Sequence, residues 1–198
     1  GARYRLPAEL VRDLALQISG LLVPRIGGPS VNPYTPGDPW REVSHYGSTP
    51  ATSQIFVQEH GEKLYRRSLY TYWKRTAPPT NLTAFDAPNR EVCVVARPMT
   101  TTPLQSLVLL NDVQFVEASR AFAERILKHA TDDRQRIEWA VWQSLGRAPE
   151  DWEVTRLLES LATQREHYRQ DQEAAKALLA NGESRRDLEL EVTEHAAW

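Results

Sequence analysis

The stretch YRRSLYTYWKRTAPPTNLTAFDAPNREVCVVARPMTTTPLQSLVLLND, residues 65–112, decides how this chain folds. It lies at the end of a region that we expect to be rich in turns. Eleven of the 13 prolines of the chain lie in this region, between Pro24 and Pro103. Each proline removes a backbone donor and restricts the residue before it, which disfavours long regular elements. Near the end of the stretch, Thr102 and Pro103 suit the N-cap and the first position of an α-helix. The sequence therefore predicts an irregular first half and a helical second half.

Apolar residues at helical spacing predict helices on both sides of this region. The C-terminal helix stops at Trp198 in the middle of its apolar stripe, so we expect the natural protein to continue. We expect one compact domain made of residues 1–112, which hold the first helix and the insert, and a helical part, residues 113–198. The predicted helices run from Pro7 to Ser19, Thr102 to Leu110, Asp112 onward, Asp132 to Gly146, Pro149 to Gln170, Glu173 to Ala180 and Leu188 to Trp198.

The proline-rich insert also contains short β-like patterns. Residues 54–59 and 63–67 read as two strands across a turn at Gly61. Residues 91–96 are apolar and β-branched, which predicts a buried strand with Cys93 as a small buried residue. The predicted architecture is therefore mainly α, with a small β-containing insert.

The composition argues against several classes of protein. The net charge is −2, with 24 basic and 26 acidic residues, whereas nucleic-acid binders usually carry a strongly basic face. No apolar run reaches the length of a transmembrane helix. A single cysteine excludes an internal disulfide, and the five histidines share no metal-ligand spacing. We therefore predict neither a metal site nor a cofactor.

No catalytic motif stands out in the sequence. Hydrolysis by paired carboxylates needs two acids within roughly 5 to 10 Å, and Asp86 and Asp112 are the candidates in the motif region. Asp86 is a weak catalytic candidate, and Asp112 has an alternative use as a helix cap. The sequence favours recognition over catalysis and leaves an enzymatic role open.

Five short motifs occur in a fixed order along the chain: RRSLY at 66–70, FDAP at 85–88, TPLQ at 102–105, LLND at 109–112 and LGRAP at 145–149. With them the chain resembles, from Tyr4 onward, the domain of unknown function family 1553, a planctomycete-type surface domain. The resemblance implies a C-terminal module of a large exported bacterial protein, located in the periplasm or at the cell surface. It implies cytochrome-like regions upstream, sometimes with a carbohydrate-binding module between, and no established reaction. Thr101 departs from the asparagine expected at that position.

Polar and aromatic residues of the motif region are the candidate binding residues. The guanidinium groups of arginines bind carboxylate, sulfate or phosphate groups through two parallel hydrogen bonds, and aromatic rings stack on sugars. The alternative is structural: Asp86 would pair with an arginine and lock the insert onto the helices, and the aromatic rings would attach the loops to the core. The candidates are Arg66, Arg67, Tyr70, Trp73, Asp86, Arg90, Arg97, Gln105, Asn111 and Asp112, with further rings at Tyr34, Trp40, Tyr46 and Tyr72.

These patterns and the resemblance lead to one functional hypothesis and one alternative. The hypothesis is a recognition module that docks the upstream cytochrome-like regions of its parent protein or binds a surface polysaccharide. The alternative is an enzyme or enzyme subunit, a hydrolase or a redox-associated protein, that acts on complex carbohydrate. In that alternative Asp86 and its arginines would line an open cleft.

Overall fold

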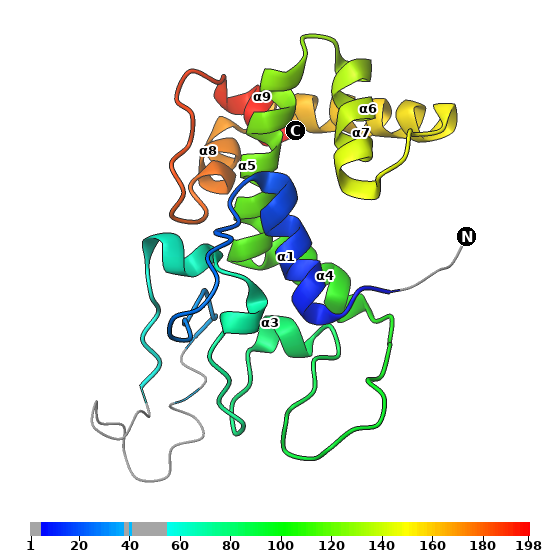
Figure 1. Ribbon diagram of the computed structural model, residues 1–198. Coiled ribbons are helices and arrows are strands. Elements are labelled where there is room, and N and C mark those ends of the chain that lie inside the picture. The colour runs from blue at the N-terminus through cyan, green and yellow to red at the C-terminus, as the bar shows by residue number, and fades with distance from the viewer. Residues whose placement is uncertain (1–4, 38–39, 41–54) are drawn as a thin grey trace. The chain divides into compact units, whose positions relative to one another are not determined.

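Helices are the regular elements of this chain in a computed structural model that describes residues 5–37, 40 and 55–198 (Figure 1). The predicted mainly helical fold is thereby confirmed. The chain divides into two compact units, residues 1–16 with 22–115 and residues 17–21 with 116–198. The α-helices are α1 (Ala8–Ser19), α3 (Thr80–Thr83), α4 (Pro103–Asn111), α5 (Val113–His129), α6 (Asp133–Leu145), α7 (Asp151–Gln170), α8 (Gln172–Leu179) and α9 (Val192–Ala197), and the 3₁₀ helices are η2 (Gly61–Tyr65) and η3 (Ser68–Tyr70).

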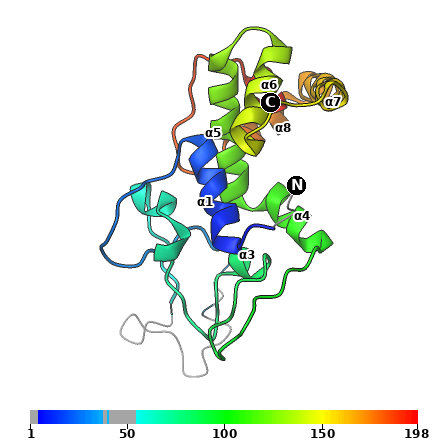
Figure 2. The ribbon, with the colours of Figure 1, turned by 45° about the vertical axis from the view of Figure 1, so that its right-hand side comes forward.

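The first unit has an apolar core built from its helices. Ala8, Leu82, Phe85 and Phe115 are buried in one cluster, and Val11 and Val108 pack against it. Phe85 and Phe115 meet edge to face with ring centroids 6.1 Å apart. Both ribbon views show α3 and α4 near the N-terminal end of α1 (Figures 1 and 2). Apolar contacts between α1, α3, α4 and the start of α5 therefore hold this unit together.

The start of α4 follows the sequence signals. Thr102 is its N-cap and Pro103 its first residue, as predicted. The side-chain oxygen of Gln105 accepts a hydrogen bond from the Thr102 amide at 3.3 Å, which satisfies a donor that the helix leaves open. The side-chain amide of Gln105 also donates to the Thr100 carbonyl at 3.1 Å. Gln105 is therefore buried for a structural reason.

The predicted β-containing insert is not present in the described part of the chain. Of the first predicted strand, residues 55–59 are irregular and Gln54 lies outside the described residues, and most of the second is the 3₁₀ helix η2. Parallel bridges join single residues only, Val23 to Arg66 and Val31 to Thr71. Prolines at 24, 29, 33 and 36 interrupt the segment that provides these bridges, and proline cannot continue a hydrogen-bonded ladder. The bridges therefore do not extend into strands.

The prediction of a buried strand at residues 91–96 is also wrong. All six residues are exposed and none is in a strand. Cys93 is accordingly an exposed free cysteine rather than a buried one. Apolar, β-branched sequence favours a strand only where a neighbouring strand can pair with it, and the described residues offer none here.

The second unit is made of helices with well-defined ends. Asp132 caps α6 by accepting a hydrogen bond from the Gln135 amide at 3.0 Å, and Gly146 ends the helix in the left-handed conformation with φ of 66°. Ala175, Leu179 and Ala196 form a small core between α8 and α9. Arg165 of α7 binds Asp133 at 2.5 Å and also pairs with Glu194, which ties α7 to α6 and α9. Figure 2 shows α7 nearly end-on.

The second unit contains a histidine that is almost completely buried. His195 is 1% exposed, and its Nε2 donates to the Arg120 carbonyl oxygen at 3.0 Å. Its Nδ1 is buried and has no hydrogen-bond partner among the residues that the structure describes. Burial lowers the pKa of His195, although the Arg120 carbonyl and Glu124 act in the opposite direction. The ring is therefore held in its neutral form.

None of the described helices combines the length and the apolar character that crossing a membrane requires.

Candidate functional site

Arg12 is a buried side chain of the first unit that donates four hydrogen bonds. It is 2% exposed, and its Nε donates to Gln114 Oε1 at 2.5 Å. Its Nη1 donates to the Arg66 carbonyl at 2.7 Å and to Ser68 Oγ at 3.1 Å, and its Nη2 donates to the Leu64 carbonyl at 2.7 Å. Burial lowers its pKa to about 10, so it remains charged at neutral pH. Arg12 therefore holds segment 64–68 against α1 and α5 and was not recognised as important from the sequence.

Arg66 organises the loop that follows α1. Its Nη2 donates to the carbonyls of Arg25, at 3.1 Å, and Gly27, at 2.5 Å, and its Nη1 donates to Pro29 at 3.1 Å. The guanidinium lies 3.8 Å from the ring centroid of Tyr70, whose hydroxyl accepts from the Gly27 amide. This predicted anion-binding arginine faces carbonyl oxygens instead of an open pocket.

The carboxylate of Asp86 interacts with residues of its own unit. Its carboxylate lies 3.0 Å from Arg5 and accepts 2.8 Å hydrogen bonds from the backbone amide and the hydroxyl of Thr100. The pKa of Asp86 is lowered, and the hydrogen bond from the Thr100 amide contributes most to this shift. Asp86 also has a φ of 64°, an unusual conformation for a residue other than glycine. This is the closed arrangement that the structural interpretation of Asp86 predicts.

The cavity beside Asp86 is small. It has a volume of about 90 Å³ and is lined by Arg5, Asp86, Arg97 and apolar neighbours. Arg97 in addition pairs with Glu9 at 2.7 Å. A space of this size is far below that of ordinary ligand pockets.

The remaining candidates are spread over the surface of the first unit. Arg90 stacks on Trp73 at 4.5 Å, and the indole N–H of Trp73 donates to the Asn89 carbonyl at 3.2 Å. Arg67 is exposed. The structure therefore does not bring the ten polar and aromatic candidates together in one pocket.

Most aromatic rings of the insert are engaged within the fold. Tyr34 and Trp40 are buried, and Trp40 packs edge to face on Phe56 with ring centroids 5.4 Å apart. Tyr72 packs on Trp40 and keeps an exposed fraction of 43%. Tyr46 lies outside the described residues. These contacts are those expected of rings that attach loops to a core.

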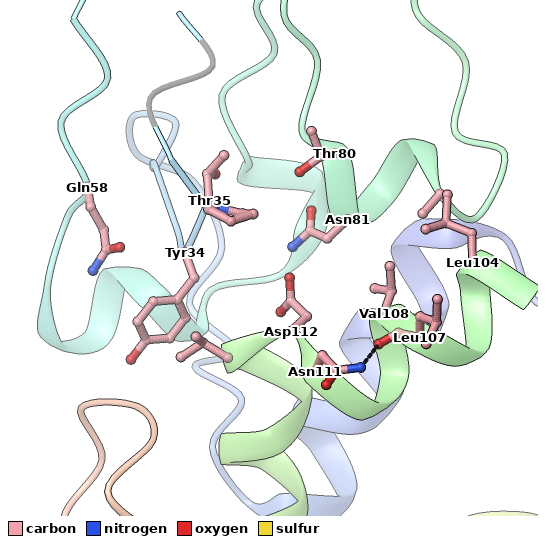
Figure 3. Close-up of a pocket in the computed structure, with 13 residues that line it drawn as sticks. Tyr34, Thr35, Gln58, Thr80, Asn81, Leu104, Leu107, Val108, Asn111 and Asp112 are labelled. Atoms are coloured by element: carbon pink, nitrogen blue, oxygen red, sulfur yellow. Dashed lines mark hydrogen bonds between the residues drawn. The ribbon is translucent and has the colours of Figure 1, made fainter. Parts of the chain in front are cut away.

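A larger cavity of about 500 Å³ lies along α4, within the first unit (Figure 3). Its walls are mainly apolar, and its volume suits a ligand or a group of side chains. Figure 3 shows the lining side chains coming from the 34–36 loop, Gln58, α3, α4 and the start of α5. The lining residues are Tyr34, Thr35, Pro36, Gln58, Thr80, Asn81, Ala84, Leu104, Leu107, Val108, Asn111, Asp112 and Val113.

The apolar wall of this cavity continues onto the surface of α4. Leu104 and Leu107 line the cavity and are 57% and 56% exposed, and Leu110, on the same helix, is 72% exposed. A short helix that is apolar on every side is normally buried. Exposed apolar surface of this kind is typical of interaction sites.

Two polar side chains lie at the inner side of the cavity. Figure 3 shows the carboxylate of Asp112 and the amide of Asn81 pointing toward one another. Asp112 Oδ1 accepts a 2.9 Å hydrogen bond from the Gln114 amide, so Asp112 caps α5 as predicted. Burial raises the pKa of Asp112, while the amides of Gln114 and Phe115 and the charge of Arg12 oppose the shift. The cavity therefore combines apolar walls with one poorly solvated carboxylate.

This arrangement offers little for hydrolysis. Among the described residues that line the cavity, Asp112 is the only carboxylate, whereas paired-carboxylate catalysis needs two. In the described ranges, 5–37, 40 and 55–198, no three His, Cys, Asp or Glu side chains cluster as metal ligands would. The chemistry that the cavity supports is binding of an apolar group with a hydrogen-bonding function.

Sequence reasoning found part of this cavity and missed the rest. Of the predicted candidates, Asn111 and Asp112 of the LLND motif and the ring of Tyr34 line it. The Asn111 amide donates to the Leu107 carbonyl at 2.9 Å, within its own helix. Asn81 and the leucines were missed, although the apolar residues on all sides of α4 gave a signal.

The comparison with known families agrees with the motifs. No curated protein and no solved structure is significantly similar to this chain. A family model described as "Protein of unknown function (DUF1553)", PSD1, matches residues 1–161, most of the chain. The chain therefore belongs to the DUF1553 family.

Proposed function

We propose that this chain is a recognition module that binds an apolar segment of a partner polypeptide in the cavity along α4. The observation that carries the proposal is the 500 Å³ apolar cavity, which opens beside leucines that remain more than half exposed. Covering such leucines removes apolar surface from water, which favours association. A hydrophobic centre of this kind is also where the binding energy of protein interfaces concentrates.

The aromatic residues support a polypeptide partner more than a polysaccharide. Sugar binding by stacking needs flat rings that are open to solvent. Tyr34 and Trp40 are buried, and Trp73 is covered on one face by Arg90. Tyr72 alone among the described rings of the insert keeps more than a third of its surface exposed.

The family resemblance suggests where the partner comes from. We propose that the chain is part of a larger exported bacterial protein in the periplasm or at the cell surface. Its partner would then be the cytochrome-like region that precedes it in the parent protein. Within one parent, even a modest interface suffices, because a tether makes the effective concentration of the partner high.

A binding experiment with matched variants tests the proposal. The probes are the purified upstream region of the parent protein, dextran and dextran sulfate, each titrated calorimetrically into this chain. Leu107→Asp places a charge in the apolar wall, and Leu188→Asp is the control, because Leu188 is also exposed but lies in the second unit. We expect the upstream region to bind, Leu107→Asp to weaken binding at least tenfold, and Leu188→Asp to leave it unchanged.

Two results would contradict the proposal. Equal affinity of Leu107→Asp and the unmodified chain for the upstream region would show that the cavity is not the binding site. Binding of a dextran with no binding of the upstream region would favour the polysaccharide hypothesis.

A further inference from the structure

Asn81 is a largely buried residue whose side-chain amide faces the cavity along α4. Its exposed fraction is 7%, and it lies in α3 with its side chain directed into the cavity (Figure 3). Its side-chain amide has no hydrogen-bond partner among the described residues. The amide atoms of Asn81 reach the cavity, so their hydrogen-bond partner is water or a ligand that enters the cavity.

Asp112 provides a second open position beside it. One carboxylate oxygen, Oδ1, is engaged by the Gln114 amide as the cap of α5. The carboxylate faces Asn81 across the cavity, and the residues that line the cavity include no other charged group. The pair therefore presents acceptors from both side chains and donors from the Asn81 amide.

The chemistry of this pair discriminates between classes of ligand. An anion would be repelled by Asp112, and a pure hydrocarbon would cover the Asn81 amide and the second Asp112 oxygen without bonding to either. An ammonium group has donors only, so it would leave the Asn81 N–H groups unpaired. The charge of Arg12 also compensates Asp112 in part, which reduces the attraction for a cation. A neutral group with one donor and one acceptor satisfies the pair.

We propose that the main-chain amide of the bound partner segment hydrogen-bonds to Asn81 and Asp112, while its aliphatic side chains lie against Leu104, Leu107 and Val108. The peptide N–H would donate to a carboxylate oxygen of Asp112, and the peptide carbonyl would accept from the Asn81 amide. This inference rests on the proposed function and adds the feature of the ligand that the site recognises. The pair would select a polypeptide over other apolar molecules, because every polypeptide carries this group.

The test uses a ligand pair that differs in one hydrogen-bond donor. The probes are N-acetyl-Leu-Leu-methylamide and the depsipeptide in which an ester oxygen replaces the central N–H. Both are titrated into the ¹⁵N-labelled 198-residue chain, and the amide signals are followed by NMR. We expect the peptide to shift signals of residues along α4 and to bind about tenfold more tightly than the ester.

Variants of the chain sharpen the test. Asn81→Leu keeps the number and branching of the side-chain heavy atoms and should weaken the peptide about tenfold without weakening the ester. Asp112→Asn keeps the helix cap through its side-chain oxygen, since asparagine caps as well as aspartate, but replaces the other carboxylate oxygen by an amide that donates and cannot accept. We expect Asp112→Asn to weaken the peptide about tenfold and to leave the affinity for the ester unchanged, because the ester has no N–H to donate. Unchanged peptide affinity in this variant would overturn the hydrogen bond from the peptide N–H to Asp112.

The outcomes separate this inference from the proposed function. Equal affinity of peptide and ester, with both lost in Leu107→Asp, would overturn the inference and leave the proposed function standing. If the dipeptide is too small to bind, the upstream region serves as probe, and an unchanged affinity in Asn81→Leu overturns the inference. If no polypeptide binds, the proposed function fails and this inference fails with it. The ester comparison uses the unmodified chain, so it stays decisive even if a variant does not fold.

Discussion

Arg12 and Asn81 are both buried polar residues of the first unit, but their surroundings differ. All three guanidinium nitrogens of Arg12 donate to groups of its own chain, at 2.5 to 3.1 Å. Asn81 is buried to a similar degree, and its amide faces a cavity without a partner. Buried polar groups with all their hydrogen bonds made serve the fold, and those left open beside a cavity indicate a site. The difference therefore separates the structural part of this unit from its candidate binding site.

Replacing Arg12 should give the largest loss of stability. Arg12→Met keeps much of the aliphatic packing but removes the donors to the carbonyl of Arg66, Ser68 Oγ and Gln114 Oε1. Removing one member of a buried charged network typically lowers the free energy of unfolding by about 3 to 5 kcal/mol. Urea unfolding followed by tryptophan fluorescence measures the loss. The exposed neighbour Arg67, replaced by Met, should change the unfolding midpoint very little, and similar losses in both variants would remove the distinction.

Replacing Asn81 should have the opposite sign. Asn81→Leu exchanges an amide that has no partner among the described residues for an apolar side chain with the same branching, so we expect the free energy of unfolding to rise by about 1 to 2 kcal/mol. For a chain of this length, that corresponds to an increase in Tm of roughly 2 to 8 °C in a thermal melt. Asn181 is the control, because its amide donates to the carbonyls of Ala177 and Leu178, and Asn181→Leu should not stabilise the chain. A destabilised Asn81→Leu would mean that its amide is satisfied.

Replacing Asp86 should cost less than replacing Arg12. Asp86→Asn removes the ion pair with Arg5 but keeps a residue type that tolerates the φ of 64°. We expect a loss of at most about 1 kcal/mol in a urea titration, because this ion pair is only partly buried. Asp86→Ala adds the strain of the left-handed conformation and should lose more. If Asp86→Asn and Asp86→Ala were both as stable as the unmodified chain, neither the carboxylate nor the left-handed conformation at residue 86 would matter for stability.

His195 extends the comparison to the second unit, where its buried Nδ1 has no hydrogen-bond partner among the described residues. Its pKa is lower in the folded chain than the ordinary value of 6.5, so the unfolded chain binds the proton more readily. Stability is therefore full above about pH 6.5 and falls as the pH decreases below it, with a slope of at most about 1.4 kcal/mol per pH unit. Urea midpoints between pH 7.5 and 5 should show this fall.

The pH experiment needs two controls. His195→Asn should remove the fall, since no group titrates there. Asp112 acts in the opposite direction, because its raised pKa makes the folded chain bind a proton more readily as the pH falls. The series is therefore repeated in Asp112→Asn, where the fall due to His195 should be at least as steep. A flat profile in that background would show that His195 is not held neutral by the fold.

Local signals in the sequence predicted much of the helical fold. Thr102 with Pro103, Asp112, and Asp132 with Gly146 each marked a helix end within one or two residues. These signals work because capping and left-handed residues act on backbone groups a few positions away. Helix ends could therefore be predicted from single short segments.

Strands and the cavity could not be predicted in this way, because both depend on distant segments. Residues 91–96 have strand-like composition, but they are exposed because no partner strand exists in the described chain. The cavity unites segments near residues 34, 58, 81 and 107, whose proximity no local pattern contains. The polar motif region did include Asn111 and Asp112, yet it gave equal weight to Arg66, whose two terminal nitrogens donate to carbonyls inside the fold.

The exposed thiol of Cys93 gives this chain a chemical handle at a single position. The sequence contains one cysteine, and the loop that carries it lies between Arg90 and Arg97, which are anchored to Trp73 and Glu9. A maleimide dye would therefore attach at one known place on the unmodified sequence. Energy transfer from that dye to a second dye on a bound polypeptide would report distances during binding, and no engineered cysteine would be required.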